Sequence, residues 1–223
     1  MKITVSSPNI ARVRTHCLVI AVHENGRWSA SARKVEAATR GLISTLMKAG
    51  DIDGRPGTVL MTPAPSGLNA QRLLLVGVGE HPDADDFARA AAATAQRLCT
   101  TPATNAVVTL AEISAKGIDP STRARVLAQA LHNATYRFNQ LKTGASKEVA
   151  KRDAALTRVT LVPGSSSTAS VTRAGVKEAT AIANGMKLAQ DLGNLPGNLC
   201  TQLPGYPGTK TFAQPRLGRQ DPG

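Results

Sequence analysis

Short apolar runs alternate with stretches of helical periodicity along most of the chain, and this alternation limits the fold more than any other feature. The runs Cys17–Val22 and Leu73–Val78 are almost entirely apolar, which is typical of strands buried on both faces of a sheet. Between them, apolar residues at positions 35, 38, 42, 46 and 47 predict one helix that ends at a left-handed cap on Gly50. Strands separated by helices predict an α/β protein with helices on the faces of its sheet.

The same patterns predict the remaining elements. The strand that contains Leu73–Val78 is expected to begin at Arg72. Further strands are expected at residues 1–5, 58–61, 105–110 and 157–162, the first of them at an edge of the sheet. Further helices are expected at 83–99, 122–138 and from about 171 to 193. Pro82 is expected in the first turn of the helix over 83–99, and Met186 on the inward face of the last helix.

Three parts are expected along the chain. Residues 1–163 form the layered α/β domain, and residues 164–201 form a long linker helix and the start of a further segment. Residues 202–223 are expected to be irregular and disordered, because four Pro and four Gly fall within residues 201–223 and no period is visible there.

Composition narrows the class of protein. An apolar fraction of 42% is ordinary for a globular chain. Cys17, Cys99 and Cys200 are odd in number and widely spaced, which argues against a disulfide framework or a zinc ribbon. The longest apolar stretch is far shorter than the roughly 20 residues that cross a bilayer, and the first residues do not resemble a secretory signal. We therefore expect a cytoplasmic protein with no membrane partner.

The net charge of +12 is spread along the chain. Such a surface attracts polyanions without a dedicated site, and a basic solvated surface is the simplest interpretation. Five basic residues form the densest positive stretch: Lys142, Lys147, Lys151, Arg152 and Arg158. No aromatic residue lies between Phe138 and Tyr206 to stack on the bases of a single strand, so a solvated connection is favoured there, while duplex DNA remains an open alternative.

Two short motifs suggest binding sites but have simpler explanations. Gly77-Val78-Gly79 follows an apolar strand, as phosphate loops do, but the further glycines or the Gly-Lys-Ser/Thr of such loops are missing, which favours a strand-to-helix turn. Asp83, Asp85 and Asp86 could be imagined as metal ligands, but carboxylates are also favoured at the start of a helix, and we prefer that interpretation.

The sequence predicts no catalytic, cofactor-binding or metal-binding residue in this chain. Its four histidines, His16, His23, His81 and His132, show no zinc-helix spacing. The nucleophile-elbow pattern Gly-x-Ser-x-Gly is absent, and the three serines at 165–167 follow Pro163-Gly164 as a flexible turn.

One long segment points to a known family. Residues 182–201, read together with the supporting segments 138–143 and 59–79, resemble the end of the N-terminal domain of the leucyl (cytosol) aminopeptidases. The resemblance covers residues 1–201. It implies an N-terminal α/β domain of macro-domain-like fold, joined by a helix to a peptidase domain with two divalent metals, manganese or zinc. It also implies release of N-terminal amino acids, preferably leucine, from peptides by a cytoplasmic homo-hexamer.

The sequence departs from that family in its last residues. The Asn-Thr-Asp-Ala-Glu-Gly-Arg signature, the metal carboxylates and the catalytic Lys and Arg of the family have no counterpart here. We therefore expect a truncated, non-catalytic N-terminal domain whose last helix exposes an apolar face and promotes association. Residues 202–208 can be encoded so that a second reading frame gives Ser-Tyr-Leu-Gly-Thr-Gln, which suggests the hypothesis of a frameshift.

Two alternatives to a truncated aminopeptidase remain open. Some bacterial relatives also bind DNA, and the basic charge is compatible with a DNA-binding or architectural role. The macro-like fold implied by the resemblance suggests a third function, a pocket for a nucleotide-like ligand. That suggestion rests on analogy of fold alone.

Overall fold

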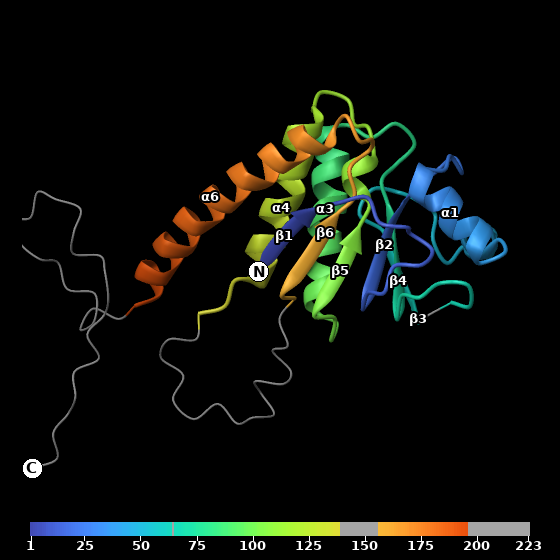
Figure 1. Ribbon diagram of the computed structural model, residues 1–223, viewed down its shortest axis with the longest axis horizontal. Coiled ribbons are helices and arrows are strands. Elements are labelled where there is room, and N and C mark those ends of the chain that lie inside the picture. Colours follow the sequence, from blue (N-terminus) through green and yellow to red (C-terminus); the bar gives the residue numbers. More distant parts are fainter. Residues whose placement is uncertain (64, 139–155, 196–223) are drawn as a thin grey trace, which may run out of the picture.

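The computed structural model describes residues 1–63, 65–138 and 156–195, and within them one six-stranded sheet forms the centre of the fold (Figure 1). In spatial order the strands are β1 (Lys2–Val5), β6 (Arg158–Leu161), β5 (Asn105–Val108), β2 (Cys17–Val22), β4 (Arg72–Gly77) and β3 (Val59–Pro63). All neighbouring pairs are parallel except β3 and β4, which are antiparallel. The prediction of an edge strand at residues 1–5 is confirmed.

The central strand β2 separates two layers of helices, because successive side chains of a strand point to opposite faces. Cys17, Val19 and Ala21 pack in the core formed with α3 (Ala84–Cys99) and α4 (Pro120–Thr135). Their neighbours Leu18, Ile20 and Val22 pack in a second core, with α1 (Ala30–Ala38) and α2 (Leu42–Ala49). The α/β prediction, with helices on both faces of the sheet, is therefore confirmed.

The single helix predicted around residues 35–49 is wrong, because the structure contains two helices with a break between them. Arg40 and Gly41 have φ values of 54° and 92°, in the left-handed region that interrupts a helix. The Glu36 carboxylate then accepts hydrogen bonds from the backbone N–H groups of Ile43 (2.9 Å) and Ser44 (3.2 Å), which begin α2. The expected left-handed cap on Gly50 is confirmed, with φ 81°.

The start of α3 differs slightly from the prediction. Asp83 is the N-cap, and its carboxylate accepts from the backbone N–H groups of Asp85 (3.0 Å) and Asp86 (2.9 Å). Pro82 therefore precedes the helix instead of lying in its first turn, and its carbonyl accepts from the N–H of Lys116. Other boundaries shift as well: β5 ends at Val108, the 3-10 turn η1 (Leu110–Glu112) follows it, and α4 begins at Pro120.

The last helix, α6 (Ala169–Asn194), packs along α4 and runs in the same direction (Figure 1). Gly175 lies against the backbone of Ser121, and farther along the Tyr136 hydroxyl donates to Asp191 (3.0 Å). Gly175, Val176, Ala179 and Ala183 are buried, whereas residues 184–190 are exposed. Met186 was predicted to face inward, but it is 39% exposed because the covered stripe of α6 ends at Ala183.

Helix α6 exposes apolar side chains, as expected for a helix whose apolar face promotes association of the protein. Val171 and Leu188 are 41% and 50% exposed, in addition to Met186. Self-association through this surface stays a prediction, as do the domain boundaries at residues 163 and 201. The tail over 202–223 lies outside the described residues. None of the described helices combines the length and the apolar character needed to cross a bilayer.

Candidate binding pocket

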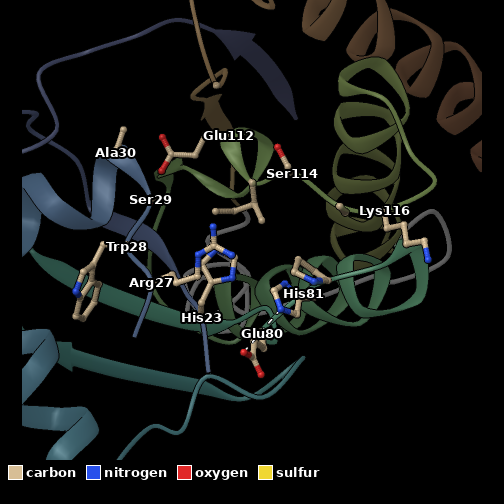
Figure 2. Close-up of a pocket in the computed structure, with 14 residues that line it drawn as sticks. His23, Arg27, Trp28, Ser29, Ala30, Glu80, His81, Glu112, Ser114 and Lys116 are labelled. Atoms are coloured by element: carbon tan, nitrogen blue, oxygen red, sulfur yellow. Dashed lines mark ion pairs between the residues drawn. The ribbon is translucent and has the colours of Figure 1, made fainter. Parts of the chain in front are cut away.

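A pocket of about 570 Å³ opens where four parallel strands end (Figure 2). After β2 the chain continues to α1 on one face of the sheet, whereas after the neighbouring β5 it continues to η1 and α4 on the other face. Open α/β sheets bind their ligands at such a switch point, outside the carboxyl ends of the strands. The lining residues come from the segments after β2, β4, β5 and β6: His23, Arg27–Ala30, Glu80–Pro82, Glu112–Lys116 and Gly164.

His23 presents one ring nitrogen for a ligand. Its Nδ1 lies 2.9 Å from the carbonyl oxygen of Gly79. Because a carbonyl only accepts hydrogen bonds, Nδ1 carries the proton and Nε2 of the neutral ring is an acceptor. His23 lines the pocket together with Arg27 and His81, and in Figure 2 it lies near the centre of the view.

The opposite wall carries a carboxylate that is already engaged. Glu112, at the end of η1, accepts two hydrogen bonds from Ser31 in the first turn of α1: from the backbone N–H (3.2 Å) and from the hydroxyl (2.9 Å). Ser29, the N-cap of α1, accepts from the N–H of Ala32 (3.1 Å). The start of α1 is thus held to the segment that follows β5.

The remaining groups of the pocket are mixed in character. Arg27 and Lys116 contribute cations, and Trp28 contributes a half-buried indole. Glu80 accepts from Asn25 Nδ2 (3.2 Å) and lies 3.7 Å from the imidazole of His81. This set can bind a small polar molecule, and the cations and an imidazole nitrogen are its recognition groups.

The glycine motif lies beside the pocket but uses its backbone for packing. Gly77 N–H donates to the carbonyl of Thr58 (2.8 Å), and Gly79 N–H donates to the carbonyl of Gly54 (2.8 Å). A Cβ on Gly77 would lie 2.1 Å from the carbonyl oxygen of Arg55. Both N–H groups are therefore satisfied by the 54–58 turn, which agrees with the interpretation as a strand-to-helix turn.

The acidic trio holds the start of α3. Asp83 and Asp86 form the reciprocal capping arrangement, and Asp86 also pairs with Arg89.

Within residues 1–63, 65–138 and 156–195, no group of three or more His, Cys, Asp or Glu side chains could hold a metal ion. The described residues therefore do not fit the two-metal centre that the family resemblance implies.

The structure brings His23 and His81 together and leaves the other two histidines elsewhere. His16 Nδ1 accepts from the N–H of Thr104 (3.2 Å), and both residues lie at the amino ends of their strands, away from the pocket. His132 on α4 has a buried Nε2 with no hydrogen-bond partner, and burial lowers the pKa of its ring. Ser165 and Ser167 form a hydrogen-bonded turn at the predicted place, and its flexibility stays a prediction. Most of the basic stretch lies outside the described residues, and only Arg158, in β6, is described.

Sequence reasoning missed this pocket, although a signal for it was present. His23 follows β2 directly, and Glu112 follows β5 within four residues. Parallel strands place their carboxyl ends at one edge, so polar residues just after apolar strands are candidates for a common site. Motif spacing along the chain does not detect such residues, because they are 89 positions apart.

Comparison with known proteins decides the family. Residues 19–145 match the N-terminal domain of the cytosol aminopeptidase family. The chain belongs to that family. The "Probable cytosol aminopeptidase" of Burkholderia multivorans is 39% identical over 192 residues, which cover 84% of this chain and 37% of that protein. The "Cytosol aminopeptidase" of Pseudomonas aeruginosa is 36% identical over 202 residues, which cover 90% and 40%.

The solved structures agree with this family assignment in fold. A tomato leucine aminopeptidase variant matches with a TM-score of 0.67 at 18% identity, covering 89% of this chain and 39% of that one. A macrodomain variant from Oceanobacillus iheyensis matches with a TM-score of 0.56 at 11% identity, covering 80% and 92%. The macro-like fold implied by the resemblance is thus confirmed. The aminopeptidase-family chain spans about two fifths of the length of these curated relatives.

Proposed function

We propose that this chain is the non-catalytic N-terminal module of a cytoplasmic, metal-dependent aminopeptidase that removes N-terminal amino acids, preferably leucine, from peptides. On this proposal the 223-residue polypeptide has no peptidase activity by itself. The two divalent metals and the residues that hold them belong to the part of the longer enzymes that this chain does not match.

The match to the N-terminal domain carries the proposal. The relatives align with this chain over only 37–40% of their own length, and the matching profile is that of the N-terminal domain. Metal-dependent peptide hydrolysis requires clustered ligands that activate water and polarise the carbonyl. The described residues supply a fold and a polar pocket, but they supply no such cluster.

A hydrolysis assay tests the proposal directly. The purified chain is incubated with leucine p-nitroanilide and Mn²⁺, and the complete Burkholderia multivorans relative serves as the active control. We expect turnover by the relative and none by this chain, with circular dichroism showing that the chain is folded. The proposal would be refuted by a metal-dependent hydrolytic activity that elutes together with the 23.2 kDa chain in size-exclusion chromatography.

A chimera gives a positive readout for the same proposal. Residues 1–195 of this chain replace the aligned segment of the Burkholderia multivorans relative. If these residues are an N-terminal module of the same kind, the chimera folds and retains leucine p-nitroanilide hydrolysis. A chimera that is folded and metal-loaded but inactive would contradict the assignment of the module.

Net charge supports a second candidate function, DNA binding. A formal charge of +12 on 223 residues favours contact with a phosphate backbone. Binding to a duplex of defined sequence is compared with binding to a scrambled duplex over a range of salt concentrations. Saturable preference for one sequence would support a DNA-binding role. Equal affinities that fall together with salt would show only nonspecific attraction.

A further inference from the structure

A second pocket, of about 400 Å³, lies at the amino ends of the strands, away from the pocket described above. The segments that lead into β2 and β4 border it, together with the first residue of β5. Its lining residues are all polar: Arg14, Thr15, His16, Asn69, Gln71 and Asn105. Ligand pockets measure about 300–1,000 Å³, and a few placed polar groups give them their specificity. This amino-end pocket is therefore a candidate site for a small polar ligand.

Hydrogen bonds hold the walls of the amino-end pocket in place. The backbone N–H of Gln71 donates to the carbonyl of Thr15 (3.0 Å), and the side-chain amide of Asn69 donates to the carbonyl of Arg12 (3.1 Å). On the β5 side, the hydroxyl of Thr15 donates to Asn105 Oδ1 (2.9 Å). Thr15 is 5% exposed, so this link between segments is buried. The walls are thus formed in the free protein, which lowers the cost of binding.

The same network determines which polar atoms are left for a ligand. Asn105 Oδ1 also accepts from the backbone N–H of His16 (3.0 Å), and because a backbone N–H only donates, this atom is the oxygen of the amide. The NH₂ group of Asn105 is therefore left to donate. The backbone N–H of Thr104 donates to His16 Nδ1 (3.2 Å), so the proton of the neutral ring is on Nε2, which is a second donor.

The charge around the amino-end pocket favours an anion. Arg14 lines it with a guanidinium, and no carboxylate occurs among the described residues that line it. Burial raises the pKa of Cys17, the first residue of β2, and the positive charges of Arg72 and Arg97 oppose that rise. Their field therefore acts at the start of β2, beside the pocket. The pocket at the carboxyl ends, in contrast, contains two carboxylates.

We propose that the amino-end pocket binds the oxyanion group of a small organic phosphate or carboxylate, with Arg14, His16 and Asn105 as its donors. Ionised oxygens only accept hydrogen bonds, and a guanidinium beside two neutral N–H donors satisfies them. This inference goes beyond the proposed function and does not depend on it, because the pocket lies within the described domain and needs no metal.

The first test uses the complete wild-type chain, with inorganic phosphate and succinate as separate probes. At constant ionic strength, the side-chain NH₂ signals of Asn105 in ¹⁵N-labelled protein should shift in a saturable way with at least one probe. The probe with the lower Kd identifies a phosphate or a carboxylate as the preferred group. If neither probe shifts these signals, the inference is wrong, and this result needs no variant to fold.

Arg14→Gln and Arg158→Gln form a matched pair, because both side chains are exposed and each substitution removes one positive charge. Arg14 lines the pocket, whereas Arg158 lies opposite Asn105 in β6 and is not among the described lining residues. In calorimetry, loss of a charge-assisted hydrogen bond should raise the Kd of the better probe about tenfold in Arg14→Gln. Arg158→Gln should raise it about twofold at most, because salt screens exposed charges. Equal increases would show general attraction to a basic surface and overturn the inference.

Asn105→Asp tests the amide donor separately from the packing. The new carboxylate keeps an oxygen that accepts from Thr15 and from the N–H of His16, but it replaces the donating NH₂ group by a charged acceptor. Circular dichroism should therefore show a folded protein, and the Kd of the better probe should rise by more than about tenfold. A folded variant that binds the probe as tightly as wild type would show that this amide is not a donor, and the inference would fail.

Discussion

Replacement of Gly175 by Ala tests the packing of α6 on α4 most directly. A Cβ built on Gly175 lies 2.1 Å from the carbonyl oxygen of Ser121, and 2.9 Å from its carbonyl carbon. Ordinary contacts between carbon and oxygen are about 3.3–3.6 Å long. The new methyl group therefore requires the two helices to separate by more than about 1 Å at this point.

The magnitude follows from two opposing effects. Overpacking costs about 1–3 kcal/mol, and the upper part of the range applies here because the obstacle is backbone, which cannot rotate away. Alanine regains about 1 kcal/mol over glycine in a helix. We therefore expect Gly175→Ala to lower the free energy of unfolding by about 2 kcal/mol.

The same helix provides a matched control. Gly185 is exposed, and a Cβ on it meets nothing within 4 Å. Gly185→Ala should therefore raise the free energy of unfolding by about 1 kcal/mol. Urea denaturation followed by circular dichroism measures both variants. If Gly175→Ala is stabilised as much as Gly185→Ala, α6 does not pack on α4 as described.

Three further predictions concern other parts of the fold. Glu36→Ala leaves the N–H groups that begin α2 without their acceptor, so the free energy of unfolding should fall by about 1–2 kcal/mol in urea denaturation, and a loss below about 0.3 kcal/mol would contradict the cap. The backbone N–H of Thr122 donates to the Asp119 carboxylate and holds the pKa of Asp119 below the ordinary 3.8. The stability advantage of wild type over Asp119→Asn should therefore be constant above pH 3.8 and shrink as pH falls through the lowered pKa. Thermal unfolding at a series of pH values measures this advantage, and an advantage that grows at low pH would refute the prediction. Burial raises the pKa of Cys17 to about 12, so iodoacetamide at neutral pH should modify Cys99 before Cys17 in the native protein. Peptide mass mapping measures the order of labelling, and faster labelling of Cys17 would mean that β2 is not buried.

The periodicity of the sequence was sufficient to predict the sheet and most helices. Strands such as β2 and β4 are buried on both faces, so their apolar runs are unbroken and easy to recognise. Helix α3 combines an apolar face with acidic residues at its start, and both signals agree. Local preference and tertiary burial point to the same structure in these elements.

The break between α1 and α2 could not be predicted from periodicity. Apolar residues continue at helical spacing from Val35 to Met47, across the break. The interruption depends on Arg40 adopting a left-handed conformation that residues other than glycine rarely adopt. It also depends on Glu36 reaching across the turn, and neither feature alters the hydrophobic pattern.

The pocket was hidden from sequence reasoning for a different reason. His23 and Glu112 line one pocket because β5 lies next to β2, and strand order is not visible in the spacing of residues. Two hydrogen bonds join Glu112 to Ser31, and the spacing of these residues along the chain does not predict them. The close approach of Gly175 to α4 is likewise a property of packing and leaves no local signal.

The hydroxyl of Tyr136 determines where the far end of α6 points. From Gly175 to Asn194 the helix rises by about 28 Å, so a tilt of about five degrees at the buried end would swing Asn194 by about 2.5 Å. Tyr136 opposes this swing by donating to Asp191 and accepting from Asn194 (3.2 Å). Helix α6 is therefore held against α4 near both of its ends, by close packing at Gly175 and by the Tyr136 hydroxyl at the far end.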